Sequence, residues 1–249
     1  MACGRGTTRV ALAVLAVLLL GACRADLSVE VAQGAGGSGH VRATVNLDAE
    51  AAAQVPDLAS QLRVDDLERA GWAVEGPYRR PGGGLGLRVE KPFASADGAQ
   101  RAIQELSGSG GPFSSLRLTT KRRFWKTTTA LQGTVDLRAG LAAFGDPELA
   151  KVLGSPDLGL DPAALERQLG KPLSQVVGVE LVGNLPGTVT SNAPRARGGS
   201  AVWPVPLGSS TTVAASSQAW NVRSLVLAGV AVLCCLALLA VLVRRRRRI

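Results

Sequence analysis

The sequence has few of the residues on which catalysis and metal binding depend. It has one histidine, His40, and four cysteines, of which Cys3 and Cys23 lie near the N-terminus and Cys234 and Cys235 lie in a C-terminal apolar run. The middle of the chain therefore offers no disulfide framework and no Cys/His zinc spacing. A catalytic triad could use only His40, and no Gly-x-Ser-x-Gly motif accompanies it. We expect no catalytic residue, no metal and no cofactor.

The sequence also lacks a basic central region, although its formal net charge is +9. Arg5 and Arg9 precede the first apolar run, and Arg244 to Arg248 follow the last one. Without these seven arginines, 21 basic residues remain against 19 acidic ones. Basic residues that flank apolar segments are typical of membrane orientation, whereas nucleic-acid binding needs basic residues along the domain itself. We therefore expect a membrane as partner and no nucleic acid.

The N-terminus has the order of a signal peptide. Basic residues come first, Val10 to Leu20 is apolar throughout, and Gly21 and Ala22 are small. The apolar run is too short to cross about 30 Å of hydrocarbon. The stretch Leu-Gly-Ala-Cys that ends at Cys23 resembles the bacterial lipobox. It predicts a lipoprotein signal peptide over residues 1–22 and lipidation of Cys23; the alternative is an ordinary signal peptide with an incidental cysteine.

A second apolar run lies near the C-terminus. Leu225 to Val243 contains no charged residue, Trp220 precedes it, and five arginines follow it. This pattern predicts a transmembrane helix over residues 223–243 and a cytoplasmic basic tail over 244–249. The alternative is a buried helix of a soluble domain. With the helix, residues 23–222 would form a domain on the extracytoplasmic face of the cell membrane.

Between these ends, strand patterns alternate with short helical patterns. Leu27–Val31 and His40–Leu47 have period-two apolar residues and are joined by the glycine-rich GAGGSG, which indicates a hairpin. Asp97 is predicted to cap a helix that follows it, and further pairs of strands are expected before and after this helix. The fold class is therefore α+β, an antiparallel sheet with short helices. A second all-β lobe that begins near residue 172 is an open alternative. The other expected strands are Trp72–Tyr78 and Leu85–Phe93, which form a second hairpin, two within Phe113–Arg138 that fold back near Trp125, and Val176–Leu181, Thr188–Ser191, Ala201–Val205 and Thr211–Ser217.

One local sequence, TTKRRFWKTTT, places four basic residues around two aromatic ones. In an extended strand alternate residues share a face, so Arg122, Phe124 and Lys126 would lie on one side. Cations beside rings suit a membrane surface, where cations meet phosphates and rings enter the interface. The alternative is a charged strand edge that resists aggregation. The candidate contacts with anionic lipid are Lys121, Arg122, Arg123, Phe124, Trp125 and Lys126.

The order of these features resembles the LppM-type lipoproteins of actinobacteria. The resemblance covers the lipobox, the paired strands, Gly71-Trp72, Leu116–Leu137 and the segment SNAPRARGGSAVWPVPLG, followed by the C-terminal helix and the arginines. It implies a membrane-tethered, extracytoplasmic α+β domain linked to envelope lipids, and it implies no catalytic residues.

From the sequence we expect an envelope lipoprotein that binds or helps to handle a lipid or glycolipid, without catalysis. A scaffold for a protein partner in the envelope is the alternative, and a hydrolase is the third hypothesis.

Overall fold

The computed structural model describes residues 24–54, 64–108, 110–140, 143, 166–167 and 170–246. Cys23 lies outside them, so its lipidation stays a prediction. In the described residues the fold is mixed α+β with two sheets and few helices, as the sequence predicts.

The larger sheet has seven strands in the order β3-β4-β2-β1-β7-β10-β9. Its neighbours pair antiparallel except β1 and β7, which run parallel because they are joined by a long crossover. Both hairpins expected near the N-terminus are present as β1/β2 and β3/β4. The strands are β1 Ala25–Gln33, β2 Gly39–Leu47, β3 Ala73–Arg79, β4 Leu85–Phe93, β7 Val177–Asn184, β9 Arg195–Arg197 and β10 Ser200–Pro204.

The smaller sheet has four strands in the order β5-β6-β11-β8. Strands β5 and β6 form the hairpin expected around Trp125, and all pairs are antiparallel. Strands from before and after residue 172 pair within both sheets. The strands are β5 Arg117–Arg122, β6 Lys126–Asp136, β8 Thr188–Ser191 and β11 Ser210–Trp220.

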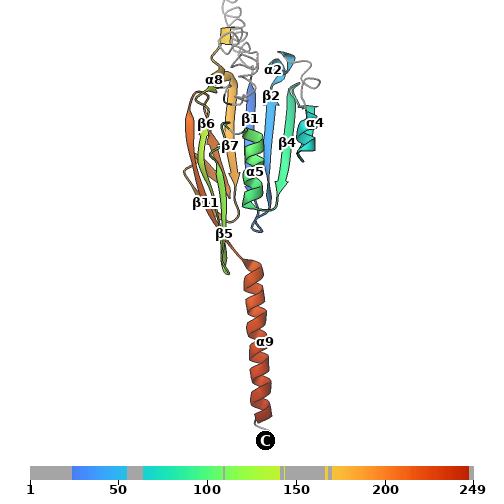
Figure 1. Ribbon diagram of the computed structural model, residues 1–249, viewed down its shortest axis with the longest axis vertical. Helices are drawn as coiled ribbons and strands as arrows, with labels where there is room; N and C mark the ends of the chain where they lie inside the picture. The colour runs from blue at the N-terminus through green and yellow to red at the C-terminus, as the bar shows by residue number, and fades with distance from the viewer. Residues whose placement is uncertain are drawn as a thin grey trace, which may run out of the picture.

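Helix α5, Ala96–Ser107, covers part of the inner face of the larger sheet through contacts with β2 and β4 (Figure 1). Ser95 caps it: its hydroxyl accepts a hydrogen bond from the Gly98 amide at 3.2 Å. The sequence had indicated Asp97 as the cap, which is wrong because Asp97 already lies in the first turn. The other helices are α2 Ala49–Gln54, α4 Val64–Arg69, α8 Leu173–Val176 and α9 Val222–Arg246.

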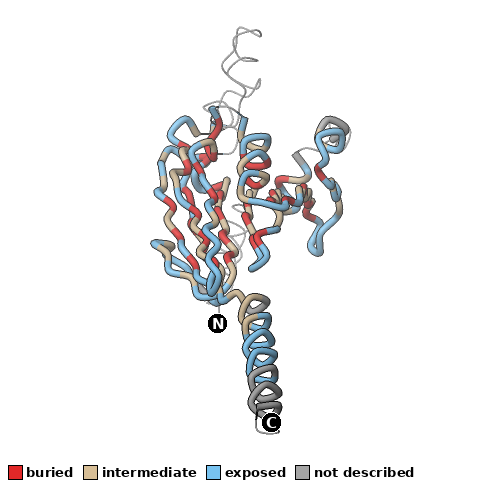
Figure 2. The backbone as a smooth tube through the Cα atoms, turned by 60° about the horizontal axis from the view of Figure 1, so that its bottom comes forward, coloured by how far each residue is buried: buried red, intermediate tan, exposed pale blue. Residues whose placement is uncertain are grey.

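The core lies between the two sheets and under α5, where Figure 2 shows the buried segments. Strand residues alternate between this core and the outside, as the pleat requires. On β1, for example, Val29 and Val31 are buried while Ser28 and Glu30 face outward. The largest fully buried side chains come from both sheets, from α5, from the loop before β5 and from the residue after β6: Trp203, Phe113, Ile103, Leu116, Leu131, Leu137 and Leu181.

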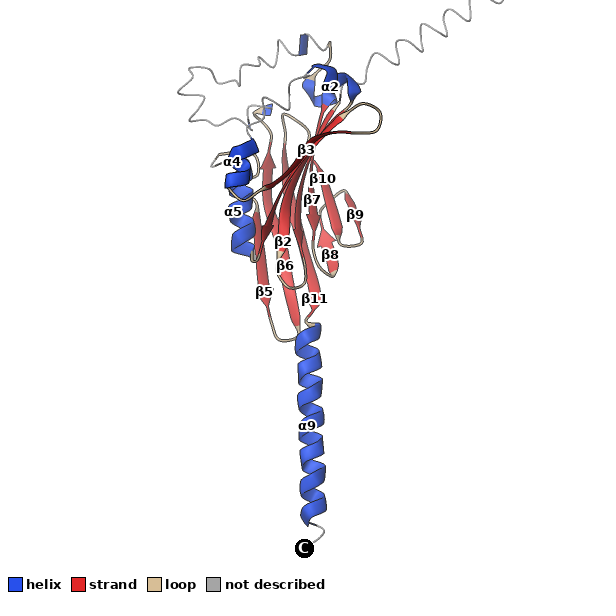
Figure 3. Cartoon of the chain, turned by 90° about the vertical axis from the view of Figure 1, so that its right-hand side faces the viewer, coloured by secondary structure: helices blue, strands red, loops and turns tan. Residues whose placement is uncertain are grey.

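The strands give the domain two distinct ends. At one end lie the β1–β2 turn, the β5–β6 turn and the exit of β11 into α9. At the other end lie Arg24, Leu47 and the start of β7, which are adjacent in the register of the sheet, together with α2 and α8. Figure 3 shows α2 and α9 at these opposite ends.

The predicted transmembrane helix must be corrected. Crossing a membrane takes roughly 20 consecutive apolar residues. Among the described residues, no helix is both long enough and apolar enough to cross one, and this includes α9. The prediction of a membrane span over residues 223–243 is therefore wrong for the structure as described.

Candidate functional site

The six residues predicted to contact anionic lipid, Lys121 to Lys126, are called the tip. They comprise the end of β5, the turn and the first residue of β6. All six are exposed, and the side chains of Phe124 and Trp125 are each 55% exposed. The expectation that both aromatic residues extend a strand is wrong. Arg123, Phe124 and Trp125 make the turn, which is closed by the Arg123 amide donating to the Lys126 carbonyl at 2.9 Å. The two rings therefore lie together, edge to face, with centroids 4.7 Å apart.

Arg122 has a different role from the other cations of the tip. Its guanidinium donates to the carbonyl of Gly36 in the glycine-rich β1–β2 turn. Close by, Thr120 donates to the Gln33 side chain at 3.1 Å, and the Gln33 amide donates to the Gly37 carbonyl at 2.8 Å. These contacts join the base of the tip to the larger sheet. Arg122 is therefore a positioning residue, with its guanidinium occupied by the protein.

The remaining cations of the tip are open to a ligand. Among the described residues, neither Lys121 nor Arg123 forms an ion pair, and Lys126 donates to the neutral side chain of Gln218 at 3.1 Å. The tip itself contains no acidic residue. Three positive charges thus stand beside two exposed rings on one short turn. Such a surface attracts anions and offers apolar area next to them.

Further exposed apolar residues adjoin the tip. Trp220, 69% exposed, ends β11 opposite Lys126, and the Asn221 amide donates to the Trp125 carbonyl at 2.8 Å. Helix α9 starts directly after this contact and points away from the sheets (Figure 1). Apolar surface of this extent on one end of a domain marks an interaction site. Its exposed apolar side chains are Val226, Leu227, Val230, Val232, Leu233 and Leu236.

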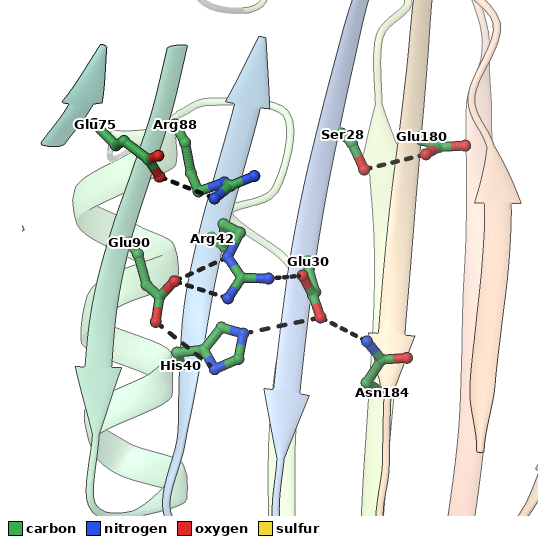
Figure 4. Close-up of polar contacts among 9 residues, drawn as sticks. All are labelled: Ser28, Glu30, His40, Arg42, Glu75, Arg88, Glu90, Glu180 and Asn184. Atoms are coloured by element: carbon green, nitrogen blue, oxygen red, sulfur yellow. Dashed lines mark hydrogen bonds and ion pairs between the residues drawn. The ribbon is translucent and has the colours of Figure 1, made fainter. Parts of the chain in front are cut away.

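A polar network that the sequence did not reveal covers the outer face of the larger sheet (Figure 4). Arg42 on β2 bridges Glu30 on β1, at 2.7 Å, and Glu90 on β4, at 2.8 Å. Asn184 on β7 also donates to Glu30 at 2.5 Å, and His40 lies 3.8 Å from Glu30 and 4.0 Å from Glu90. The alternation of charged and apolar residues along each strand was visible in the sequence and could have indicated that these charged side chains share one face. The strand order that brings them together could not be read from the sequence.

The charges of this network satisfy one another. The hydrogen bond from Arg42 is the main cause that holds the pKa of Glu90 below its ordinary value. Partial burial works against the charge of Arg42, yet its hydrogen bonds and charge attraction to Glu90 and Glu30 raise its pKa. His40 lies between these two carboxylates on the outer face of the sheet. Among the described residues, no cluster of His, Cys, Asp or Glu could hold a metal ion.

The fold defines a two-sheet α+β domain with an exposed basic and aromatic tip. No protein-family model matches the chain, and no curated protein matches it. One solved structure is similar: the NMR structure of the folded domain of the Mycobacterium tuberculosis LppM protein. The TM-score is 0.44 at 15% sequence identity, over 82% of this chain and 94% of that one. No family is assigned to the chain.

Proposed function

We propose that this protein works at a membrane surface of the cell envelope, where the tip binds anionic lipid without catalysis. The observation that supports this most directly is the tip itself, where Phe124 and Trp125 are exposed beside Lys121, Arg123 and Lys126. Aromatic rings favour the membrane interface, and each basic residue near an anionic surface adds on the order of 1 kcal/mol of binding free energy.

The position of the tip supports the same proposal. Arg122 fastens it to the β1–β2 turn, and the Asn221–Trp125 contact fastens it to the start of α9. The tip is therefore held by two neighbours and projects from the end of the domain as a fixed element. Because it is already ordered, little conformational entropy is lost when it binds.

The competing hypothesis of a protein scaffold has less support from the described strands. Edge strands that recruit partners are usually long and regular. Here β9 has three residues and carries Arg195 and Arg197, β8 has four residues, and β3 is interrupted by a bulge that contains Pro77. Strand β5 lies beside α5. These edges do not favour a partner that adds a strand.

The test is flotation of the full chain with phosphatidylcholine vesicles that contain or lack phosphatidylglycerol. We expect Lys121→Gln with Arg123→Gln to weaken binding to the anionic vesicles about 25-fold, since each charge contributes roughly fivefold. Phe124→Ser with Trp125→Ser should reduce the blue shift of tryptophan fluorescence on binding, because it removes Trp125 and leaves Trp220 as the other exposed tryptophan at this end of the domain.

Arg79→Gln with Arg80→Gln is the matched control. Both side chains are exposed, and they lie at the β3–β4 turn, at the end of the domain opposite the tip. This variant loses the same amount of charge, but at the end of the domain far from the tip, so it should bind the anionic vesicles like the wild type. Equal weakening by both pairs would mean that only net charge matters, and the proposal for the tip would then fail.

A further inference from the structure

A pocket of about 250 Å³ opens on the outer face of the smaller sheet, directly beside the tip. It is shallow and is formed by three neighbouring strands, β8, β11 and β6. Its floor is regular sheet, so the side chains that line it are placed by the strand register. They are Lys126, Thr188, Thr190, Ser216, Gln218, Ala219 and Trp220.

The register sets these side chains in rows across the sheet. Gln218 lies between Thr188 on β8 and Thr128 on β6, and Lys121 on β5 extends this row by one strand. Ser216 lies opposite Thr190 in the next row. A row closer to the tip pairs Trp220 with Lys126.

The polar side chains in these rows can all donate hydrogen bonds. The lining has hydroxyl groups, one amide and one ammonium group, and it contains no carboxylate. The hydrogen bond from Lys126 to the Gln218 oxygen directs the ammonium group over the pocket and leaves the Gln218 amide free to donate outward. Trp220, 69% exposed, adds an apolar wall on the side of the tip. Such a lining favours an anion with several acceptor oxygens.

The number of hydrogen-bond donors in the pocket favours a phosphate monoester over a phosphodiester as its ligand. A phosphodiester has only two free oxygens, fewer than the donors of this pocket. A phosphate monoester has three terminal oxygens and carries about −1.5 to −2 charge at pH 7. Lys126 supplies a positive charge in the lining, and Lys121 adds a second one two strands from Gln218 in the same row.

We propose that this pocket binds a phosphate monoester, presented on a lipid headgroup or as a free phosphate compound. The inference rests on the proposed function, because it assigns a headgroup preference to the same membrane-facing end of the protein. The tip supplies general attraction to an anionic surface. The pocket supplies selectivity among anionic headgroups.

The experiment compares binding of the full chain to vesicles that contain phosphatidic acid or phosphatidylglycerol, at mole fractions giving equal zeta potential. Phosphatidic acid should bind at least about tenfold more tightly, the equivalent of one charge-assisted hydrogen bond. This preference should grow between pH 5 and 7.5, because the second ionisation of the phosphate lies near pH 6. Equal binding of the two lipids at pH 7.5 would overturn the inference.

Thr188→Val with Thr190→Val removes two hydroxyls and keeps the β-branched shape of both side chains. It should erase the preference for phosphatidic acid and leave binding to phosphatidylglycerol unchanged. Thr119→Val with Thr212→Val is the control, since both residues are exposed in the same sheet and neither lines the pocket. A Thr188/Thr190 variant that keeps the preference while folded, as judged by its thermal transition, would also overturn the inference.

Two further results separate the possible failures. Loss of all anionic binding in the Phe124→Ser/Trp125→Ser variant, together with equal binding of both lipids by the wild type, would leave the proposed function intact and reject only the pocket. Competition by glycerol 3-phosphate would mean that the pocket recognises the phosphate group from either source. A lipid preference without competition would restrict the ligand to the headgroup in a membrane.

Discussion

At the scale of single residues, Asn192 joins the two sheets. Its side-chain oxygen accepts hydrogen bonds from the Trp203 indole at 2.8 Å and from the Ala214 amide at 3.0 Å, and its amide donates to the Thr212 carbonyl at 2.9 Å. Trp203 belongs to the larger sheet and is only 1% exposed, whereas Ala214 and Thr212 belong to the smaller sheet. The side chain of Asn192 therefore forms hydrogen bonds with polar groups of both sheets.

Asn192→Ala should be strongly destabilising. It leaves the buried indole donor of Trp203 without a partner, which costs about 1–3 kcal/mol, and it removes two contacts to β11 as well. We expect the midpoint of urea unfolding to fall, with little change in the slope of the transition. Asn192→Asp, which keeps the acceptor oxygen, should recover part of the loss. A variant Asn192→Ala as stable as the wild type would contradict this role.

The tip shows what sequence could and could not predict about a site. The composition of Lys121 to Lys126, in which cations and rings are adjacent, singled out a segment that the structure shows to be exposed. The arrangement was wrong, because a strand alternation was applied to residues that form a turn. The use of Arg122 as a fastening to Gly36 depends on two sheets meeting, which no local pattern contains.

At the scale of the elements, local pairing was predictable and distant pairing was not. The hairpins β1/β2, β3/β4 and β5/β6 follow from alternating apolar residues around short polar or glycine-rich turns. The parallel pairing of β1 with β7 joins Ala25 to Val177, across most of the domain. Such a pairing is specified by packing of the whole core, and periodicity within either strand does not encode it.

A substitution of Arg42 tests the polar network that crosses these strands. Because its hydrogen bond is the main cause of the lowered pKa of Glu90, Arg42→Gln should raise the Glu90 pKa toward its ordinary value. The lowered pKa stabilises the fold above the unfolded pKa of Glu90, near 4.5, and this contribution is lost as the pH falls through the folded pKa. The variant should therefore lose less stability than the wild type between pH 5 and 3.

Carbon NMR of the Glu90 carboxyl gives the pKa directly, and urea unfolding at pH 5 and pH 3 gives the stability difference. Arg88→Gln is the control, since Arg88 is only the last contributor to the Glu90 shift and pairs with Glu75 at 2.9 Å. If Arg88→Gln moved the Glu90 pKa as far as Arg42→Gln, the hydrogen bond would not be the principal cause.

At the scale of the whole molecule, the sheets share one core. Leu131 on β6 is fully buried and lies against Gly183 on β7, next to Trp203. A Cβ atom at Gly183 would lie 3.1 Å from both Leu131 and Trp203, so these side chains would have to shift to admit it. The described strands should therefore unfold together.

Leu131→Ala should reduce the free energy of unfolding by about 2–5 kcal/mol, because it opens a cavity between the sheets. Amide hydrogen exchange should accelerate in β1 and β7 as much as in β6 and β11. Leu233→Ala makes the same chemical change at a side chain that is 67% exposed, and it should alter stability by less than about 0.5 kcal/mol. Faster exchange confined to the smaller sheet would mean that the two sheets open independently.

The opposite ends of the domain also determine how it would respond to tension. Arg24 precedes β1 at one end, and β11 leaves for α9 at the other, beside the tip. A pull between these points runs along the strands and across hydrogen bonds that lie perpendicular to it, so many bonds share the load at once. Strand β11, for example, is paired with β6 over its full length, from Ser210 to Trp220. A domain connected in this way would transmit force along its strands and resist stretching.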